Sequence, residues 1–212
     1  MKTELYSDQL NRWPSEGRNI MAHYDEQTIV VYQAYNAAIA SYAVANQRFG
    51  GAFSFSRMSW LKPNFLWMMY RSDWAKSSNQ EHVLAITLPR TGFDSLLAQA
   101  VESSFQASVY DSHDAWRENI ANSEVRLQWD PDHDPHGLPT VRRAVQLGLR
   151  GEVLRQYGEL WPVEIRDITD FVHEQHRYML ADQLHRLQLP VERVYPVSDQ
   201  TTASRIRLDV LD

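Results

Sequence analysis

The fold is decided largely by residues 57–74, which read RMSWLKPNFLWMMYRSDW. Their centre, Phe65 to Tyr70, is an unbroken apolar run within a stretch that is compatible with a helix. At roughly 100° per residue such a run covers every face of a helix, so we expect a helix that is fully buried rather than amphipathic. Charged side chains flank the run on both sides: Arg57, Lys62, Arg71 and Asp73. The segment therefore predicts a buried helix with a cationic, aromatic-rich mouth.

Composition bounds the class of protein. The chain has 212 residues, 43% of them hydrophobic, which is typical of a globular domain that can bury a sizeable core. Its net charge of −6 argues against coating nucleic acid non-specifically but allows a local basic pocket. The absence of cysteine excludes disulfides and thiolate chemistry. Without a leader-like or membrane-length apolar run, we expect a cytoplasmic protein with no membrane partner.

The pattern along the chain mixes strands and helices without a regular βαβ rhythm. We therefore expect an α+β fold, a single domain with a largely antiparallel sheet, flanking helices and the one fully buried helix. Residues 1–18 are interpreted as a polar arm, 19–190 as the globular domain, and 191–212 as an irregular tail packed on it. Strands are expected at 28–35, 83–88, 124–129, 143–149 and 163–168. Helices are expected at 36–48, 91–104, 112–121, just after 151, and 169–187.

Lys62 is the leading candidate for binding a ligand. Only three of the 21 basic residues are lysines, and this one lies in the most apolar part of the chain. It precedes Pro63 at the expected start of the buried helix, where free N–H groups and the helix dipole already favour an anion. Arg57 could add a bidentate contact to a phosphate or carboxylate, and Trp60 could stack on a planar ring. The alternative is an internal salt bridge from Lys62 to Glu81 or Asp73.

Two further groups of residues are candidates for the site. Strand alternation places Tyr32 on one face of the 28–35 strand and Gln33 with Tyr35 on the other, where their polar groups need partners. Gln128 and Asp130 stand at the end of another expected strand, where turn chemistry is the alternative. The candidate catalytic residues are thus Tyr32, Gln33, Gln128 and Asp130. The candidate ligand-binding residues are Tyr35, Arg57, Trp60, Lys62, Arg71 and Arg143, although Arg71 could simply complement the end of the helix.

Other chemistries find little support in the sequence. The turn 130–137, DPDHDPHG, offers carboxylates and imidazoles, but its spacing matches no standard zinc or calcium loop. His173 and His176 are three apart, one residue short of the metalloprotease spacing. Neither a dinucleotide-binding glycine motif, a P-loop nor a nucleophile elbow occurs. We therefore predict no metal site.

Several stretches resemble a known family. YDEQTIVVYQAYN, FSFSRMSWLKPNFLWMMYRSDW, QEHVLAI, VRLQWDPD and RAVQLGLRGE are similar to the family of domain of unknown function 4291. The similarity covers roughly residues 20–171, and the tryptophan-rich segment is its most specific part. The resemblance implies no established activity. It does imply which positions to watch: Tyr32, Gln33, Tyr35, Arg57, Trp60, Lys62, Trp67, Arg71, Gln128, Trp129, Asp130 and Gln146. The histidines at 133–136 depart from the pattern.

Two functions from different classes follow. The order of elements loosely resembles the ADP-ribosyltransferase fold, which implies a transferase that uses NAD or a similar phosphate-bearing small molecule. On that reading Gln128 stands where the fold usually places a glutamate, and an amide cannot act as a general base. The alternative is a non-catalytic module that binds a nucleotide or RNA through the Arg57, Trp60 and Lys62 mouth. An enzyme should hold a titratable group of the pocket near its working pKa, whereas a binder needs only donors and stacking faces.

Overall fold

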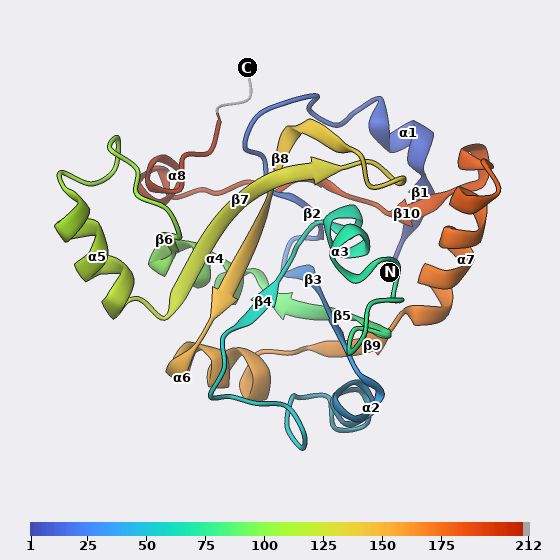
Figure 1. The fold of residues 1–212 in the computed structure, drawn as a ribbon, viewed down its shortest axis with the longest axis horizontal. Coiled ribbons are helices and arrows are strands. Elements are labelled where there is room, and N and C mark those ends of the chain that lie inside the picture. The colour runs from blue at the N-terminus through green and yellow to red at the C-terminus, as the bar shows by residue number, and fades with distance from the viewer. Residues whose placement is uncertain (210–212) are drawn as a thin grey trace.

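The computed structural model describes residues 1–209, whose strands form three sheets (Figure 1). One sheet has the order β11–β2–β3–β5–β9, a second has the order β4–β8–β7–β6, and β1 pairs with β10. All pairings are antiparallel except that of β6 with β7. The strands are β1 (Thr3–Leu5), β2 (Met21–Tyr24), β3 (Thr28–Tyr35), β4 (Ser59–Leu61), β5 (His82–Pro89), β6 (Val101–Glu102), β7 (Val125–His133), β8 (Pro139–Leu149), β9 (Glu164–Asp167), β10 (Gln188–Pro190) and β11 (Arg193–Val194).

Helices cover both faces of the five-stranded sheet. Within the described chain they are α1 (Tyr6–Leu10), α2 (Ala37–Asn46), α3 (Phe65–Ser72), α4 (Arg90–Gln99), α5 (His113–Asn122), α6 (Gly151–Arg155), α7 (Thr169–Leu180) and α8 (Gln200–Arg205), with a π-helical turn at Gln156–Leu160 and a 3₁₀ turn at Leu184–Arg186. Helices α2 and α4 pack against one face and α3 and α7 against the other. The expected single α+β domain with flanking helices is confirmed.

The sheet centre follows from the residues of β3 and β5. The two strands pair over their whole length, from Thr28 opposite Pro89 to Tyr35 opposite His82. Both are rich in β-branched residues, and both have long buried stretches. Successive side chains alternate between two cores: Val31 belongs to the core under α2 and α4, and Tyr32 to the core around α3. A strand with core on both faces reads as a continuous apolar run, as this one does.

Helix α3 is buried for most of its length, but the expectation that it is fully buried is wrong. Its first five residues, Phe65 to Met69, are all buried, and Phe65 packs edge-on against Tyr32 with ring centroids 5.5 Å apart. Tyr70, however, is 46% exposed and Arg71 is also exposed. The helix has only eight residues, and its last turn leaves the sheet for the surface beside the second sheet. The continuous buried stretch of the helix therefore ends at Met69, and in the last turn only Ser72 is buried.

Several element boundaries differ from the sequence-based expectations. The 1–18 arm forms β1 and α1 and pairs with β10, and the tail adds β11 and α8 rather than remaining irregular. Residues 210–212 of that tail lie outside the described residues. Helix α4 has no side-chain cap, whereas the Ser112 side chain caps α5. Helix α7 ends at Leu180, short of the expected 187, because the chain turns there with a left-handed Asp182. None of the described helices combines the length and the apolarity that crossing a membrane would require.

Candidate functional site

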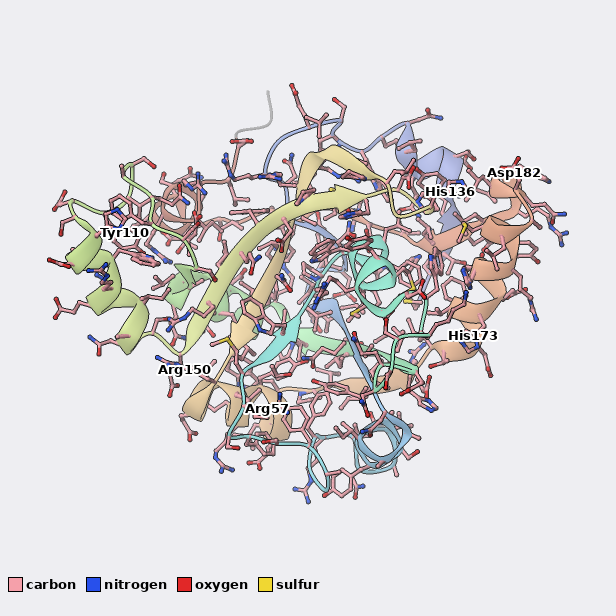
Figure 2. The ribbon with its side chains drawn as sticks, viewed as in Figure 1. Arg57, Tyr110, His136, Arg150, His173 and Asp182 are labelled. Atoms are coloured by element: carbon pink, nitrogen blue, oxygen red, sulfur yellow. The ribbon has the colours of Figure 1, made fainter. Side chains whose placement is uncertain are left out.

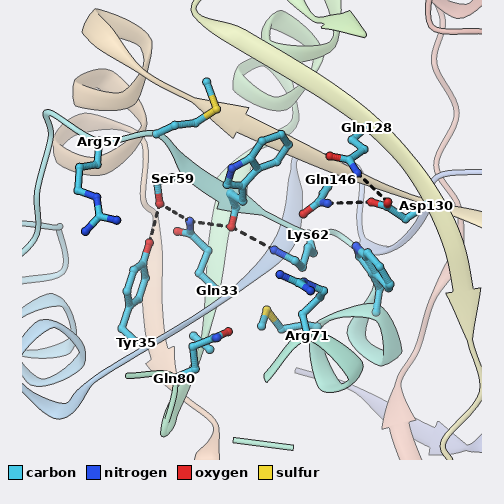
Figure 3. Close-up of a pocket in the computed structure, with 15 residues that line it drawn as sticks. Gln33, Tyr35, Arg57, Ser59, Lys62, Arg71, Gln80, Gln128, Asp130 and Gln146 are labelled. Carbon is cyan, nitrogen blue, oxygen red and sulfur yellow. Dashed lines mark hydrogen bonds between the residues drawn. The ribbon is translucent and has the colours of Figure 1, made fainter. Parts of the chain in front are cut away.

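A pocket of about 680 Å³ lies where the two larger sheets meet (Figure 3). There the chain beyond β4 joins β3 through one backbone bridge: Tyr32 N–H donates to the Lys62 carbonyl at 2.7 Å, and Lys62 N–H donates to the Tyr32 carbonyl at 3.1 Å. Strands β3, β4, β7 and β8 and helix α3 supply most of the walls. The lining residues are Gln33, Ala34, Tyr35, Arg57, Met58, Ser59, Trp60, Lys62, Trp67, Met68, Arg71, Gln80, Gln128, Asp130 and Gln146.

Lys62 is a buried cation without a counter-ion among the described residues. Only 5% of the residue is exposed, and its ammonium reaches a single hydrogen-bond partner, the carbonyl of Trp60 at 3.5 Å. No carboxylate of residues 1–209 lies within 4.0 Å of it, so the alternative of a salt bridge to Glu81 or Asp73 is not realised. Burial lowers the pKa of Lys62 from 10.5 to about 7; Arg71 lowers it too, and Asp130 opposes the change.

Two guanidiniums join Lys62 in the pocket wall. Arg57 comes from the segment before β4 and Arg71 from the last turn of α3. Within the described chain neither side chain makes a hydrogen bond to another side chain or an ion pair. Arg71 does complement the carboxyl end of α3, as the structural interpretation expected, but it also faces the cavity (Figure 3). Three cations therefore surround a cavity whose lining includes one carboxylate, Asp130.

The amino end of α3 is occupied by the protein itself. Phe65 N–H donates to Glu192 Oε1 at 2.6 Å, and the Asn64 side chain donates to Glu192 Oε2 at 3.4 Å. The expectation that free N–H groups at the start of this helix favour a ligand anion is therefore wrong for the N–H of Phe65, which Glu192 already binds. Burial raises the pKa of Glu192 to about 8, although the bond from Phe65 opposes this. Glu192 is more than a hundred residues from α3 in sequence, so no local pattern could reveal it.

A hydrogen-bond chain orders the β3–β4 wall. Tyr157 donates its hydroxyl to Gln33 Oε1 at 2.6 Å, which orients the amide so that Gln33 Nε2 donates to Ser59 Oγ at 2.8 Å and to the Trp60 carbonyl at 3.1 Å. Tyr35 and Ser59 share a further bond of 2.8 Å. The polar groups of Gln33 and Tyr35 are thus satisfied internally, the alternative that the sequence left open. The chain still delivers the Tyr35 and Ser59 hydroxyls to the pocket rim.

A second polar group, the Gln128–Asp130–Gln146 corner, lies on the β7–β8 wall (Figure 3). Gln128 Nε2 donates to Asp130 Oδ1 at 2.8 Å, and Gln146 Nε2 donates to Asp130 Oδ2 at 2.7 Å. Gln128 pairs directly opposite Gln146 across the two strands, and Asp130 is two residues further along the same face. The strand therefore continues past 129 and carries Asp130 to the cavity, where the sequence suggested a turn.

The Trp60 ring packs against a glycine. A Cβ atom added to Gly148 of β8 would lie 2.8 Å from Met58 Sδ and 2.9 Å from the Trp60 ring. Trp60 and Gly148 are partners across β4 and β8, so the missing side chain leaves room for the indole. The indole therefore packs against the backbone of β8 at Gly148. The glycine gives a physical reason for the LGL pattern at 147–149 that sequence inspection alone did not use.

Of the ten predicted site residues, eight line this pocket and two lie elsewhere. Tyr32 is fully buried in the core around α3, and its hydroxyl is 3.7 Å from Met1 Sδ. Arg143 lines a separate cavity beside Arg18, because the odd spacing from Gln146 turns it to the other face of β8. Residues not assigned to the site in advance include Ser59, Gln80 and Gln146. Ser59 is adjacent to Trp60, Gln146 was a family position to watch, and Gln80 begins the family-like stretch QEHVLAI without having been singled out.

No histidine of residues 1–209 lines the pocket, although His133 stacks on Trp67, which does. His136 is on the loop between β7 and β8 and His173 is on α7, well separated in Figure 2. His133 is buried and stacked on Tyr70, with ring centroids 3.6 Å apart, and burial lowers its pKa. Among residues 1–209 no cluster of three or more histidine, aspartate or glutamate side chains could hold a metal ion.

Comparison with known proteins identifies one related family. A family model described as "Domain of unknown function (DUF4291)" matches residues 19–195. The matched segment contains every residue that lines the pocket, and also Glu192, which caps α3. None of the curated proteins matches the chain.

Proposed function

The chain belongs to the DUF4291 family, and from its pocket we propose that it binds a nucleotide-type ligand through the phosphates and acts as an ADP-ribosyltransferase-like enzyme on NAD. One observation carries the proposal. Lys62 is buried, faces a cavity and has no carboxylate partner among the described residues. Such a buried charge destabilises the folded protein unless a bound anion compensates it.

The surroundings of Lys62 favour a phosphate over a simple carboxylate. Arg57 and Arg71 approach from different sides of the cavity, so more than one charged oxygen group can be bound at the same time (Figure 3). The volume of about 680 Å³ lies within the range of sites that enclose small organic ligands. Trp60 and Trp67 offer apolar and aromatic surface for a ring. A diphosphate carrying a planar base fits this combination.

The group near its working pKa that an enzyme requires is Lys62, whose pKa is about 7. In the proposed reaction the bond between ribose C1 and the nicotinamide nitrogen breaks, and nicotinamide leaves with the electron pair. The acceptor forms a bond to the same carbon and gives up its proton. Asp130 is the carboxylate of the lining that could take that proton. Gln128, as an amide, serves only to hold it.

Binding is tested by isothermal titration of NAD, ADP and inorganic pyrophosphate into the parent protein and Lys62→Met. The matched control is Lys76→Met, which removes an exposed lysine outside the pocket. We expect the parent and the control to bind alike and Lys62→Met to bind roughly ten- to a hundredfold more weakly, as for loss of a charged hydrogen bond. Equal affinity of all three proteins, or no binding by the parent, contradicts the proposal.

Catalysis is tested separately by nicotinamide release. The parent protein is incubated with NAD and a panel of purified protein and RNA acceptors, and free nicotinamide is quantified by chromatography. Release that is lost in Asp130→Asn supports the transferase. If NAD binds but nicotinamide is not released under any of these conditions, the transferase proposal is ruled out and a non-catalytic nucleotide-binding module remains.

A further inference from the structure

We propose that the Gln128–Asp130–Gln146 corner binds the hydroxyl groups of a ribose, so that the pocket selects ribonucleotides and fixes which end of the ligand faces β7 and β8. This inference rests on the proposed function, because it assumes that phosphates occupy the cationic part of the pocket. It adds the selection of ribose over a sugar without hydroxyls and the orientation of the ligand.

The Gln128–Asp130–Gln146 corner has hydrogen-bond donors and acceptors that the protein itself does not use. Each glutamine uses one N–H to hold an Asp130 oxygen, at 2.8 and 2.7 Å. An amide has two N–H donors and a carbonyl acceptor, and each carboxylate oxygen can accept more than one bond. Among the described residues neither glutamine carbonyl accepts a hydrogen bond. The corner therefore presents amide acceptors, carboxylate lone pairs and spare amide donors together.

The charge of Asp130 shows that the corner is not made for phosphate. Asp130 raises the pKa of Lys62 electrostatically, which means that the carboxylate is close enough for its field to act at the anion site. The same field weakens the binding of any phosphate beside Lys62. Its two amide partners orient the carboxylate without neutralising it. A ligand group that donates hydrogen bonds to Asp130 stabilises this negative charge. Two neighbouring hydroxyls can both donate to the carboxylate and accept from the amides on either side of it.

The layout of the pocket places such a sugar next to the phosphates. In Figure 3 Lys62 lies between the corner on one side and the Tyr35–Ser59–Gln33 chain on the other, with Arg71 beside it. A phosphate at Lys62 and Arg71 therefore has the corner as its neighbour. In a nucleoside diphosphate the ribose is joined directly to the first phosphate. One sugar can then reach the corner while its phosphate contacts Lys62.

The test compares ADP with 2′,3′-dideoxy-ADP, which keeps the base and the phosphates but lacks both ribose hydroxyls, and uses pyrophosphate as the phosphate-only probe. On the parent protein we expect ADP to bind at least about tenfold more tightly than the dideoxy compound, since hydroxyl bonds to a charged acceptor are lost. Asp130→Asn should shrink that ratio toward one. The same substitution should leave pyrophosphate binding unchanged or stronger, because it removes a repelling charge.

A second variant and a control separate the loss of ribose binding from a loss of folding. Gln146→Met removes one amide of the corner at similar volume and should also reduce the ratio. Gln99→Met, on the exposed surface of α4, should not change it. Circular dichroism melting establishes that each variant is folded. If the parent binds pyrophosphate and both nucleotides equally well, the ribose inference is overturned while nucleotide binding stands. If the parent binds none of them, the inference falls together with the proposed function.

Discussion

Replacing Lys62 by methionine should make the folded protein more stable while weakening its affinity for the ligand roughly ten- to a hundredfold. Lys62 lies in the pocket wall with 5% of its surface exposed, and its pKa falls from 10.5 to about 7. A difference of about 3.5 pH units, at about 1.36 kcal/mol per unit, sets an upper limit of about 5 kcal/mol for the cost of the buried charge. Replacing buried ions by apolar side chains commonly stabilises by about 1–4 kcal/mol, which is the gain we expect.

The pH dependence of that gain has a definite sign. Between about pH 7 and 10.5 the unfolded chain keeps the Lys62 proton while the folded protein releases it, so the free energy of unfolding of the parent rises with pH. Below about pH 7 both states are protonated and the full cost of the buried charge remains. The advantage of Lys62→Met should therefore be largest at pH 6 and should shrink steadily toward pH 10.

Urea unfolding of the parent, Lys62→Met and the exposed-site control Lys2→Met at pH 6, 8 and 9.5 measures these differences. The control should follow the parent at every pH. The reasoning would be refuted if Lys62→Met were less stable than the parent at pH 6. It would also be refuted if the two free energies of unfolding differed by the same amount at every pH. Either result would mean that the ammonium is solvated or paired in the folded protein.

Three further substitutions probe the surroundings of the pocket. Glu192→Gln keeps an acceptor for the amino end of α3 but removes a carboxyl whose pKa burial raises to about 8; the stability of the parent relative to the variant should therefore fall from about pH 5 to 8, as measured by urea unfolding. Gly148→Ala should displace the Trp60 ring, lower stability by about 1–3 kcal/mol and weaken nucleotide binding; unchanged tryptophan fluorescence and affinity would contradict the packing described. Tyr157→Phe leaves the buried Gln33 carbonyl oxygen without its donor and should cost about 1–3 kcal/mol in thermal or urea unfolding; an unaffected midpoint would show that water or another group replaces the hydroxyl.

Sequence alone determined the elements whose signals are local. The β-branched run of 28–35 is strand β3 with the expected limits, and Asn36 and Ser112 cap the helices that follow them. Most of the cationic, aromatic wall was also found, because Arg57 to Arg71 lie within one short segment and need only one strand and one helix to converge. Backbone propensity and capping depend on near neighbours in the chain, so they can be read without the fold.

Only the tertiary structure decided which distant residues complete that wall. The register of β7 with β8 brings Gln128, Asp130 and Gln146 together, and the same register turns Arg143 away. Strand pairing places residues by face and partner, and a shift of one position would exchange the two faces. The long-range contacts of Glu192 with α3 and of Tyr157 with Gln33 arise from packing of segments more than a hundred residues apart, for which short-range patterns contain no information.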